Sequence, residues 1–334
     1  MRTLVVTNDF PPRRGGIERY VRALCDELPP EDVVVYTASM PGDEEYDARQ
    51  PFRIHRDPTS MLLPTPAVRR RVAAVLEQEG CERVVFGAAA PLGLLARRLR
   101  AVGAMEIVAH THGHEVWWAR VPGTRWALRR IAEDVDDLTY VSEWCRDQLT
   151  PALSPRGRSR LRPLVPTVDT TVFRPGAGGA DVRRRHGIAP DALVAVCVAR
   201  MVRRKGQDTL VRVWRDVRRE HPGAVLVLVG DGPDRRRIER MVRRRGLTEC
   251  VLLTGSIDPD DVPAYLDAAD VFAMPCRTRR FGLEAEAFGI VYLEAAAVGL
   301  PVVGGVSGGA PEAVGIARAR YGATSRTVPS SSPT

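Results

Sequence analysis

Apolar and amphipathic segments alternate along the whole chain. Strands are predicted at residues 3–7, 33–37, 52–56, 83–87, 106–110 and 137–141 in the first half. Segments with a helical period fill the gaps, near residues 17–28, 66–79, 91–102, 124–134 and 143–150. Strands that alternate with helices build parallel sheets with helices on both faces. The first half is therefore predicted to be an α/β domain.

The same alternation begins again in the second half of the chain. Strands are predicted near residues 194–198, 224–229, 250–253, 271–274 and 301–303. Helices are predicted between them, near residues 208–220, 233–245, 259–268 and 289–298. The stretch from Ser154 to Pro190 is rich in Pro, Gly and Arg and interrupts the pattern.

These patterns predict two α/β domains, 1–165 and 191–314, joined by a linker at 166–190. Ligands of such domains bind at the carboxyl ends of the strands, so we expect a ligand cleft between the two halves. Residues 315–334 show no clear amphipathic period and end in Ser-Ser-Ser-Pro-Thr, which predicts a poorly ordered tail.

Composition limits the classes of protein that fit. The chain is 44% apolar and 27% charged, as soluble globular proteins are. No apolar run is long enough to span a membrane, and the strand at Leu4 follows the N-terminus so directly that we expect no signal peptide. The six cysteines are scattered without a C-x-x-C pair, so reduced thiols in a cytosolic protein are expected, with no disulfide framework or zinc site.

The net charge of +8 suits phosphates, an anionic membrane surface or nucleic acid as partners. An arginine-rich composition almost without lysine also reflects a GC-rich genome, and acidic residues are interspersed through most of the chain. Arginine clusters at 183–185, 235–237 and 243–245 are not accompanied by a nucleic-acid-binding motif, so we expect no nucleic acid partner.

Lys205 is the only lysine in the chain, and it lies in a basic run that begins at Arg200. This run follows the predicted strand 194–198, where side chains face the ligand crevice of an open α/β sheet. A lysine ammonium is a compact charge well suited to binding phosphate. The alternative is an ordinary solvated loop lysine.

Two glycines, Gly15 and Gly16, come after the first strand and before the first helix. Their N–H groups can approach an anion at the positive end of that helix. The motif is neither a Walker A loop nor G-x-G-x-x-G, so ATP and NAD are not the expected ligands. An ordinary glycine turn is equally compatible with this pattern.

Three histidines follow the predicted strand 106–110: His110, His112 and His114, with Glu115 next to the last. A metal site would need all of them on one face, but Gly113 indicates a turn between them. A histidine that contacts substrate is therefore favoured over a metal ligand, and at least one of the three is expected to be structural.

Glu286 and Glu294 flank the segment that contains Gly289 and Ile290, where a helix is predicted to begin. The N–H groups at such a helix start can bind a diphosphate, and neighbouring carboxylates can accept hydrogen bonds from sugar hydroxyls. The alternative is that these residues bind no ligand and are simply one loop glutamate and one solvated helix glutamate.

Together these motifs resemble the retaining glycosyltransferases of family 4, which have the GT-B fold of two Rossmann-like domains. The spacing of Glu286 and Glu294 matches the Glu-x7-Glu element of that family group. More narrowly, six segments resemble actinobacterial members that use GDP-mannose and a phosphatidylinositol mannoside acceptor: 7–12, 86–92, 111–115, 203–208, 273–279 and 289–294. The resemblance implies α-1,6 transfer of mannose to that lipid.

The resemblance also implies roles for the candidate residues. Gly15 and Gly16 would meet the donor diphosphate, and Arg200 and Lys205 would neutralise it in place of a metal, so no cofactor is expected. His112 would hold hydroxyls of the sugar. Glu286 would position the sugar and Glu294 the ribose. Gly289 and Ile290 would offer N–H groups to the diphosphate.

Two departures from the family pattern stand out. Residues 279–283 read Arg-Arg-Phe-Gly-Leu where the family has a glycine-rich segment. Beyond Val314 the family continues with a further strand and several helices, whereas this chain reads as a polar tail. The second domain is therefore expected to be truncated, with reduced stability or activity. A non-catalytic remnant that binds nucleotide sugars, or a transferase with another donor or acceptor, remains the alternative.

A lipid acceptor implies peripheral contact with the anionic inner face of the cell membrane. Candidate contacts are Met61–Leu63, Arg69–Arg71, Trp117–Trp118, Arg125–Trp126 and Arg129–Arg130. A solvated helix face with buried tryptophans would produce the same pattern. The sequence leaves the oligomeric state open.

Overall fold

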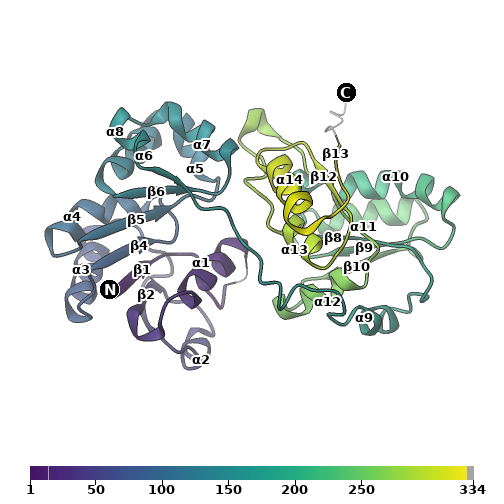
Figure 1. The fold of residues 1–334 in the computed structure, drawn as a ribbon, viewed down its shortest axis with the longest axis horizontal. Coiled ribbons are helices and arrows are strands. Elements are labelled where there is room, and N and C mark those ends of the chain that lie inside the picture. The colour runs from purple at the N-terminus through teal and green to yellow at the C-terminus, as the bar shows by residue number, and fades with distance from the viewer. Residues whose placement is uncertain (14, 329–334) are drawn as a thin grey trace. The chain divides into compact units, whose positions relative to one another are not determined.

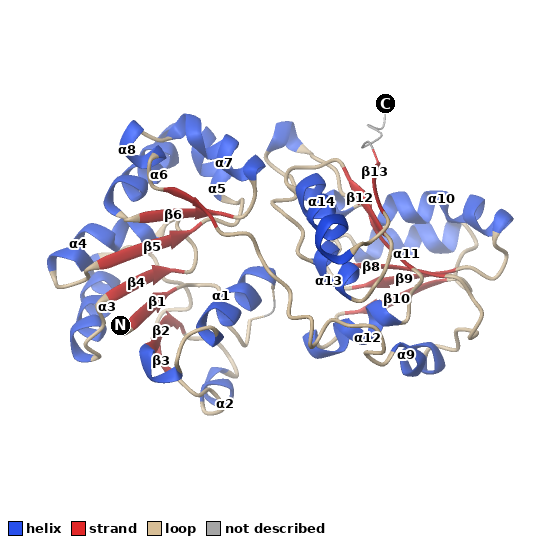
Figure 2. Ribbon diagram, viewed as in Figure 1, coloured by secondary structure: helices blue, strands red, loops and turns tan. Residues whose placement is uncertain are grey.

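The computed structural model describes residues 1–13 and 15–328. The chain divides into two compact units, Met1–Pro166 and Thr167–Thr334, each of which is built around one sheet (Figure 1). The strands of each unit lie side by side with helices around them, as Figure 2 shows. Both sheets are entirely parallel, as the alternation of strands and helices predicts.

The first unit contains a seven-stranded sheet with the order β3-β2-β1-β4-β5-β6-β7. Its strands are β1 (Thr3–Val6), β2 (Val33–Ala38), β3 (Arg53–Asp57), β4 (Arg83–Phe86), β5 (Glu106–His110), β6 (Asp137–Tyr140) and β7 (Leu161–Pro163). The short strand β7 lies at the edge of the sheet and has no counterpart in the sequence prediction.

Helices cover both faces of this sheet. They are α1 (Gly16–Asp26), α2 (Asp43–Asp47), α3 (Pro66–Gln78), α4 (Ala96–Ala101), α5 (Glu115–Arg120), α6 (Pro122–Asp134), α7 (Glu143–Leu149) and α8 (Pro155–Arg158). Leu4 and Val6 belong to the core cluster of one face, whereas Val5 belongs to the smaller cluster of the other face with Val21 of α1. Because successive strand residues point to opposite faces, a strand buried on both sides reads as one apolar run.

The second unit contains a six-stranded sheet with the order β10-β9-β8-β11-β12-β13. Its strands are β8 (Val194–Val198), β9 (Val225–Val229), β10 (Val251–Gly255), β11 (Val271–Met274), β12 (Val302–Gly305) and β13 (Ser325–Val328). Its helices are α9 (Gly179–Arg185), α10 (Gln207–Glu220), α11 (Arg235–Arg244), α12 (Val262–Asp267), α13 (Val291–Ala297) and α14 (Ala310–Tyr321).

Strand order reverses in each sheet beside its first strand, between β1 and β4 in the first unit and between β8 and β11 in the second. Ligands of open α/β sheets bind outside the carboxyl ends of the strands at such reversal points. Gly15 and Gly16 follow β1, and the predicted site residues of the second unit follow β8 or β11, whereas His112 follows the neighbouring strand β5.

The structure corrects the expectation of a poorly ordered tail at 315–334. Residues up to Tyr321 continue α14, and β13 pairs in parallel with β12, so the further strand that was expected to be missing is present. The buried positions of α14 are small residues such as Ala313 and Ala317, which produce little amphipathic contrast. The last part of the predicted tail, 329–334, lies outside the described residues.

The predicted linker at 166–190 is also not a simple connection. It contains α9, which packs against α12 of the second unit. The N–H groups of Gly176 and Gly179 donate to the Asp267 carboxylate at 2.8 and 2.7 Å. A Cβ atom at Gly179 would lie 2.4 Å from the Asp267 carbonyl oxygen, so only glycine permits this close approach.

Candidate functional site

His112 lies just beyond the carboxyl end of β5 and is tied to two neighbouring segments. Its Nε2 is 2.6 Å from the Gly87 carbonyl oxygen at the end of β4, and its backbone N–H donates to Glu115 Oε2 at 3.0 Å. A Cβ atom at Gly87 would lie 2.8 Å from the Thr7 Cβ, so glycine allows the ends of β1 and β4 to approach. The ring of His112 is thereby fixed at the ligand edge of the first sheet.

The protonation of His112 follows from these contacts. Burial lowers the pKa of the imidazole, although the Glu115 carboxylate opposes the shift, so the neutral ring is favoured near pH 7. Because a carbonyl oxygen only accepts, Nε2 carries the proton. In the neutral ring Nδ1 then keeps its lone pair, so His112 can accept a hydrogen bond from a ligand hydroxyl.

The three histidines do not converge on a single point. His110 Nδ1 lies 2.7 Å from Thr139 Oγ1, and His114 Nε2 lies 3.1 Å from Glu115 Oε1. Within residues 1–13 and 15–328, no three His, Cys, Asp or Glu side chains are grouped so that they could hold a metal ion. Burial lowers the pKa of His110 to about 3, which is the behaviour of a structural histidine.

Tyr20 of α1 was not anticipated as a site residue. Its ring meets the His112 ring edge-on, with the ring centroids 5.2 Å apart. Its hydroxyl has no hydrogen-bond partner among the described residues, and burial raises the pKa of this phenol. No sequence signal marks this tyrosine, because its position on an amphipathic helix is equally typical of a core residue.

The structure places Gly15 and Gly16 at the start of α1, where the sequence predicts them. Gly15 is the N-cap in extended conformation, and Gly16 is exposed with open space around its Cα. The Glu18 side chain turns back over Gly15, since a Cβ atom there would lie 2.1 Å from Glu18 Oε2. Burial raises the pKa of Glu18. This carboxylate lies at the helix end that was expected to bind an anion.

In the second unit, the structure brings two of the candidate residues into direct contact. Lys205 Nζ lies 2.7 Å from Glu286 Oε2, and Arg204 Nη1 lies 2.7 Å from the same oxygen. Burial alone would raise the pKa of Glu286, but the charges of Lys205 and Arg204 outweigh it and hold this pKa below its usual value. Glu286 is therefore an ionised carboxylate in a largely buried position.

The loop that carries Lys205 depends on the next residue. Gly206 has a φ of +84°, and a Cβ atom there would lie 2.1 Å from the Pro275 carbonyl oxygen. Only glycine satisfies both conditions. It lets the turn between β8 and α10 approach the segment after β11.

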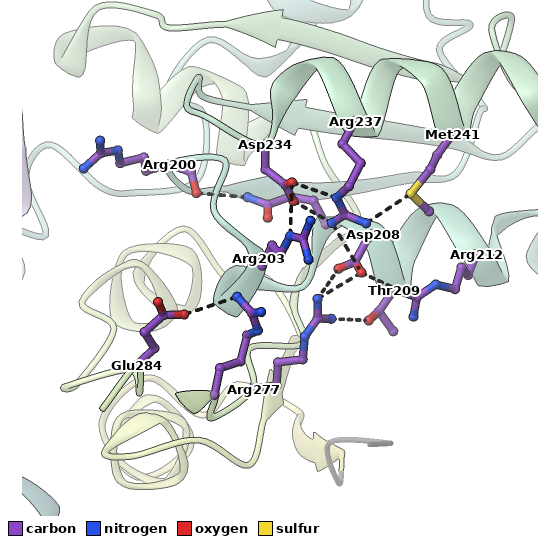
Figure 3. Close-up of polar contacts among 12 residues, drawn as sticks. Arg200, Arg203, Asp208, Thr209, Arg212, Asp234, Arg237, Met241, Arg277 and Glu284 are labelled. Carbon is purple, nitrogen blue, oxygen red and sulfur yellow. Dashed lines mark hydrogen bonds and ion pairs between the residues drawn. The ribbon is translucent and has the colours of Figure 1, made fainter. Parts of the chain in front are cut away.

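Arg200 follows β8 and is exposed. Figure 3 shows that its guanidinium points away from the acidic residues nearby, whereas its carbonyl accepts from Gln207 Nε2 at 3.3 Å. Among the described residues, no carboxylate lies within ion-pair distance of that guanidinium. Arg200 is therefore a cation available to an anionic ligand.

Asp208 is a buried residue that contacts several arginines, and the sequence analysis did not identify it as part of the site. Its carboxylate receives Arg277 Nη2 at 2.8 and 2.9 Å and Arg212 Nη2 at 2.5 Å, and Arg237 Nη2 lies 3.5 Å away (Figure 3). The Arg277 backbone N–H also donates to the Arg204 carbonyl at 2.8 Å. Asp208 thus ties the segment after β11 to the loop that carries Arg204 and Lys205.

The last group of candidate residues surrounds the start of α13. The helix begins at Val291 with Ile290 as its N-cap, two residues later than the prediction. Gly289 has a φ of +90°, and neither its N–H nor that of Ile290 has an acceptor among the described residues. Glu294 is buried in the first turn, not in the second as expected. These N–H groups are open to an anion at the positive end of the helix.

Comparison with known proteins identifies the family of this chain. The family described as Glycosyltransferase Family 4 matches residues 14–171, and the family described as Glycosyl transferases group 1 matches residues 180–323. A GDP-mannose-dependent α-(1-6)-phosphatidylinositol monomannoside mannosyltransferase of Mycolicibacterium smegmatis is 48% identical over 93% of this chain and 82% of its own. A GDP-mannose-dependent monoacylated α-(1-6)-phosphatidylinositol monomannoside mannosyltransferase of Corynebacterium glutamicum is 40% identical over 94% and 82%.

Solved structures show the same fold at low identity. HepE of Anabaena in complex with UDP has a TM-score of 0.79 at 16% identity, covering 98% of this chain and 86% of its own. Sucrose-phosphate synthase of Thermosynechococcus elongatus has a TM-score of 0.76 at 22% identity, covering 99% and 87%.

Fold and matches together define a glycosyltransferase with two Rossmann-like domains, so the predicted GT-B fold is confirmed. The chain belongs to the family 4 glycosyltransferases, in which the two mannosyltransferases above are its relatives.

Proposed function

We propose that this protein transfers mannose from GDP-mannose to a phosphatidylinositol mannoside lipid and forms an α-1,6 linkage. The observation that carries the proposal is the set of cations and carboxylates at the carboxyl edge of the second sheet, in a chain that is 48% identical to an enzyme named for this reaction. Arg200 and Lys205 supply positive charge there, and Gly289 and Ile290 supply open N–H groups.

In the proposed reaction, the bond between the anomeric carbon of mannose and the diphosphate breaks as the bond to the acceptor hydroxyl forms on the same face of the sugar. The proton of that hydroxyl passes to the leaving phosphate oxygen, and GDP is released. Arg200 and Lys205 stabilise the negative charge that develops on the diphosphate, so no metal is required in this scheme.

The carboxylates have binding roles in this scheme. Glu286 can accept hydrogen bonds from sugar hydroxyls through the lone pairs that Lys205 and Arg204 leave unused. Glu294 would accept from the ribose hydroxyls. From the first unit, Gly15 and Gly16 would donate N–H groups to the diphosphate, and His112 Nδ1 would accept from a hydroxyl of the mannose.

The experiment is a calorimetric titration of the purified protein with GDP-mannose, followed by addition of phosphatidylinositol monomannoside. We expect saturable donor binding, release of GDP and a lipid with one more mannose, whose linkage is read by NMR. Arg200→Gln should weaken donor binding and slow transfer, whereas Arg219→Gln, a change in an exposed ion pair, should do neither. Binding without turnover would favour a non-catalytic remnant. Turnover with another nucleotide sugar instead of GDP-mannose would identify that nucleotide sugar as the donor.

We also propose that the first unit binds the anionic inner face of the cell membrane peripherally, through exposed apolar and basic side chains. Met61 and Trp126 are 58% and 67% exposed, so the alternative of buried tryptophans does not hold for Trp126. Arg69 and Arg129 are exposed on α3 and α6, which both pack against α4. No helix within the described residues is long and apolar enough to cross a membrane.

Flotation with liposomes tests this contact. The protein should float with vesicles that contain anionic phospholipid, and less so at high salt, because exposed arginines attract anionic headgroups through screened charge. Trp126→Ser should reduce flotation. Met105→Ser is the matched control, since Met105 is 69% exposed just before β5, at the amino edge of the sheet. Absence of wild-type flotation would contradict the proposal.

A further inference from the structure

Glu286 lies in the loop between β11 and α13, outside any helix or strand, yet both polar groups of its backbone are paired. Its N–H donates to the Ser307 hydroxyl at 3.2 Å, and its carbonyl accepts from the Gly309 N–H at 2.8 Å. Both partners belong to the turn at residues 306–309, which joins β12 to α14. The main chain of Glu286 is therefore held by a segment that is distant in sequence.

The turn at 306–309 is shaped to approach Glu286 closely. Gly308 has a φ of +56°, and a Cβ atom there would lie 2.0 Å from the Glu286 carbonyl oxygen. Glycine alone satisfies both conditions. Ser307 is buried, and its Oγ lies 3.0 Å from Thr278 Oγ1 in the segment after β11. A hydroxyl can make both contacts at once, because it offers one donor and two lone pairs.

The hydroxyl of Ser307 is not used to cap the helix that follows it. A serine shortly before a helix usually accepts from an N–H of the first turn, as Ser154 does from Gly157 at 3.2 Å in α8. In α14 the N-cap is Gly309, and no side chain caps the helix. The Ser307 hydroxyl is directed instead at Glu286, which makes it a tertiary contact at the carboxyl edge of the sheet.

The carboxylate of Glu286 is held from a second segment. Lys205 Nζ and Arg204 Nη1, in the loop after β8, each lie 2.7 Å from Glu286 Oε2. One segment thus fixes the backbone of this residue and the other fixes its charge. Such double support matters at a ligand site, where a displacement of about 1 Å can cost about 100-fold in rate.

We infer that Ser307 is a positioning residue for Glu286, and that the turn at 306–309 sets the place where this carboxylate meets the sugar of the donor. The inference rests on the proposed function, which assigns Glu286 to the mannose. Lys205 belongs to a separate loop that Gly206 anchors against Pro275. The effect of the turn should therefore be confined to the sugar end of the nucleotide sugar and spare the GDP end.

The test compares Ser307→Ala with Ser307→Thr, which keeps the hydroxyl, and with Thr278→Val, which removes the second partner of that hydroxyl. Ser154→Ala is the matched control, because Ser154 is also buried and also accepts a backbone N–H at 3.2 Å. For each protein, calorimetry measures the affinity for GDP-mannose and, separately, for GDP. Thermal unfolding measures stability, and hydrogen exchange measures the protection of the Glu286 N–H.

For Ser307→Ala we expect the affinity for GDP-mannose to fall by at least about fivefold, the effect of one hydrogen bond, and the affinity for GDP to change by less than about twofold. Exchange of the Glu286 N–H should accelerate. Thr278→Val should show the same difference between the two ligands with a smaller loss, and Ser307→Thr should recover most of the affinity. Ser154→Ala should bind both ligands as the wild type does, although its melting temperature should fall by a similar amount.

Equal losses for GDP and GDP-mannose in Ser307→Ala would overturn the inference, because the turn would then only support the fold of the second unit. Unchanged affinity for GDP-mannose would also overturn it, and mannose transfer by the wild type would leave the proposed function intact. If the wild type binds GDP-mannose but transfers no mannose, the proposed function fails, and a selective loss in Ser307→Ala still supports the positioning role. Absence of GDP-mannose binding by the wild type overturns both.

Discussion

Lys205 Nζ and Glu286 Oε2 lie 2.7 Å apart at the carboxyl edge of the second sheet, although the two residues are distant in sequence. The contact joins the only lysine of the chain to the first carboxylate of the Glu-x7-Glu element. Because Glu286 is largely buried, its charge and that of Lys205 stabilise each other in a position where water does so poorly.

Glu286→Gln should therefore weaken both stability and catalysis. The neutral amide leaves Lys205 and Arg204 without a carboxylate, and we expect a loss of about 1–3 kcal/mol in the free energy of unfolding. Mannose transfer should fall by about 10- to 100-fold, since the sugar loses its acceptor and Lys205 loses its position. Urea denaturation and initial rates measure the two effects. Glu239→Gln, which breaks a surface pair with Arg235, should cost less than about 1 kcal/mol and keep activity. Equal effects in both variants would contradict the role of Glu286.

Stability should decrease as the pH falls below about 6.5, because two histidines of the first unit are held neutral. Burial lowers the pKa of His112 and lowers that of His110 to about 3, from an ordinary value of 6.5. Between the folded and unfolded pKa values, the unfolded chain binds protons that the folded chain does not. Acid therefore favours unfolding, by up to about 1.4 kcal/mol per pH unit for each histidine.

The measurement is the free energy of unfolding between pH 7.5 and about 5, the range over which the unfolded histidines become charged. Because the pKa of His112 is lowered in the folded state, His112→Gln should reduce the pH slope, by at most one proton. His221→Gln, a change at an exposed position, should leave the slope as it is in the wild type. A wild-type free energy that is flat across this range would show that the histidines are not held neutral.

Asp208 is expected to act as a positioning residue for the Lys205 loop. Asp208→Asn removes the charge that holds Arg212, Arg237 and Arg277, and the remaining arginines repel one another. We expect a loss of about 2–4 kcal/mol in stability and a lower kcat, with partial recovery of both in Asp208→Glu. Asp216→Asn, at an exposed pair with Arg219, is the control and should change either quantity little. Recovery of stability without recovery of kcat in Asp208→Glu would indicate a purely structural role.

Alanine substitutions at two glycines with positive φ distinguish the cost of backbone strain from the cost of a steric clash. Gly187 has open space around it, so Gly187→Ala should lower the free energy of unfolding by only about 1 kcal/mol, because alanine disfavours the left-handed backbone. Gly206→Ala adds a collision with the Pro275 carbonyl oxygen, and should cost at least about 3 kcal/mol and reduce donor binding, because the Lys205 loop must move. Thermal unfolding measures the loss of stability in each variant, and titration with GDP-mannose measures the loss of donor binding. Similar losses in the two variants would mean that the loop accommodates the methyl group.

Most of the sheet architecture follows from the sequence alone. Parallel strands that are covered on both faces must be apolar throughout, so β1, β2, β8 and β9 appear as continuous apolar runs. Motifs that follow parallel strands lie at the carboxyl edge of the sheet, which is why Lys205 after β8, His112 after β5 and Gly16 after β1 could be placed at that edge in advance. The elements that the sequence did not predict include β7, β13, α2, α5, α8, α9 and α14, which are short, exposed or rich in small residues.

Tertiary structure decided the partners of those residues. The sequence indicates a lysine and a glutamate at ligand edges, but only the order β8-β11 brings the loop of Lys205 next to the segment of Glu286. The same adjacency lets Asp208 gather Arg277. Hydrophobic periodicity records which face of an element is buried, whereas polar contacts depend on distances between segments that are far apart in the chain.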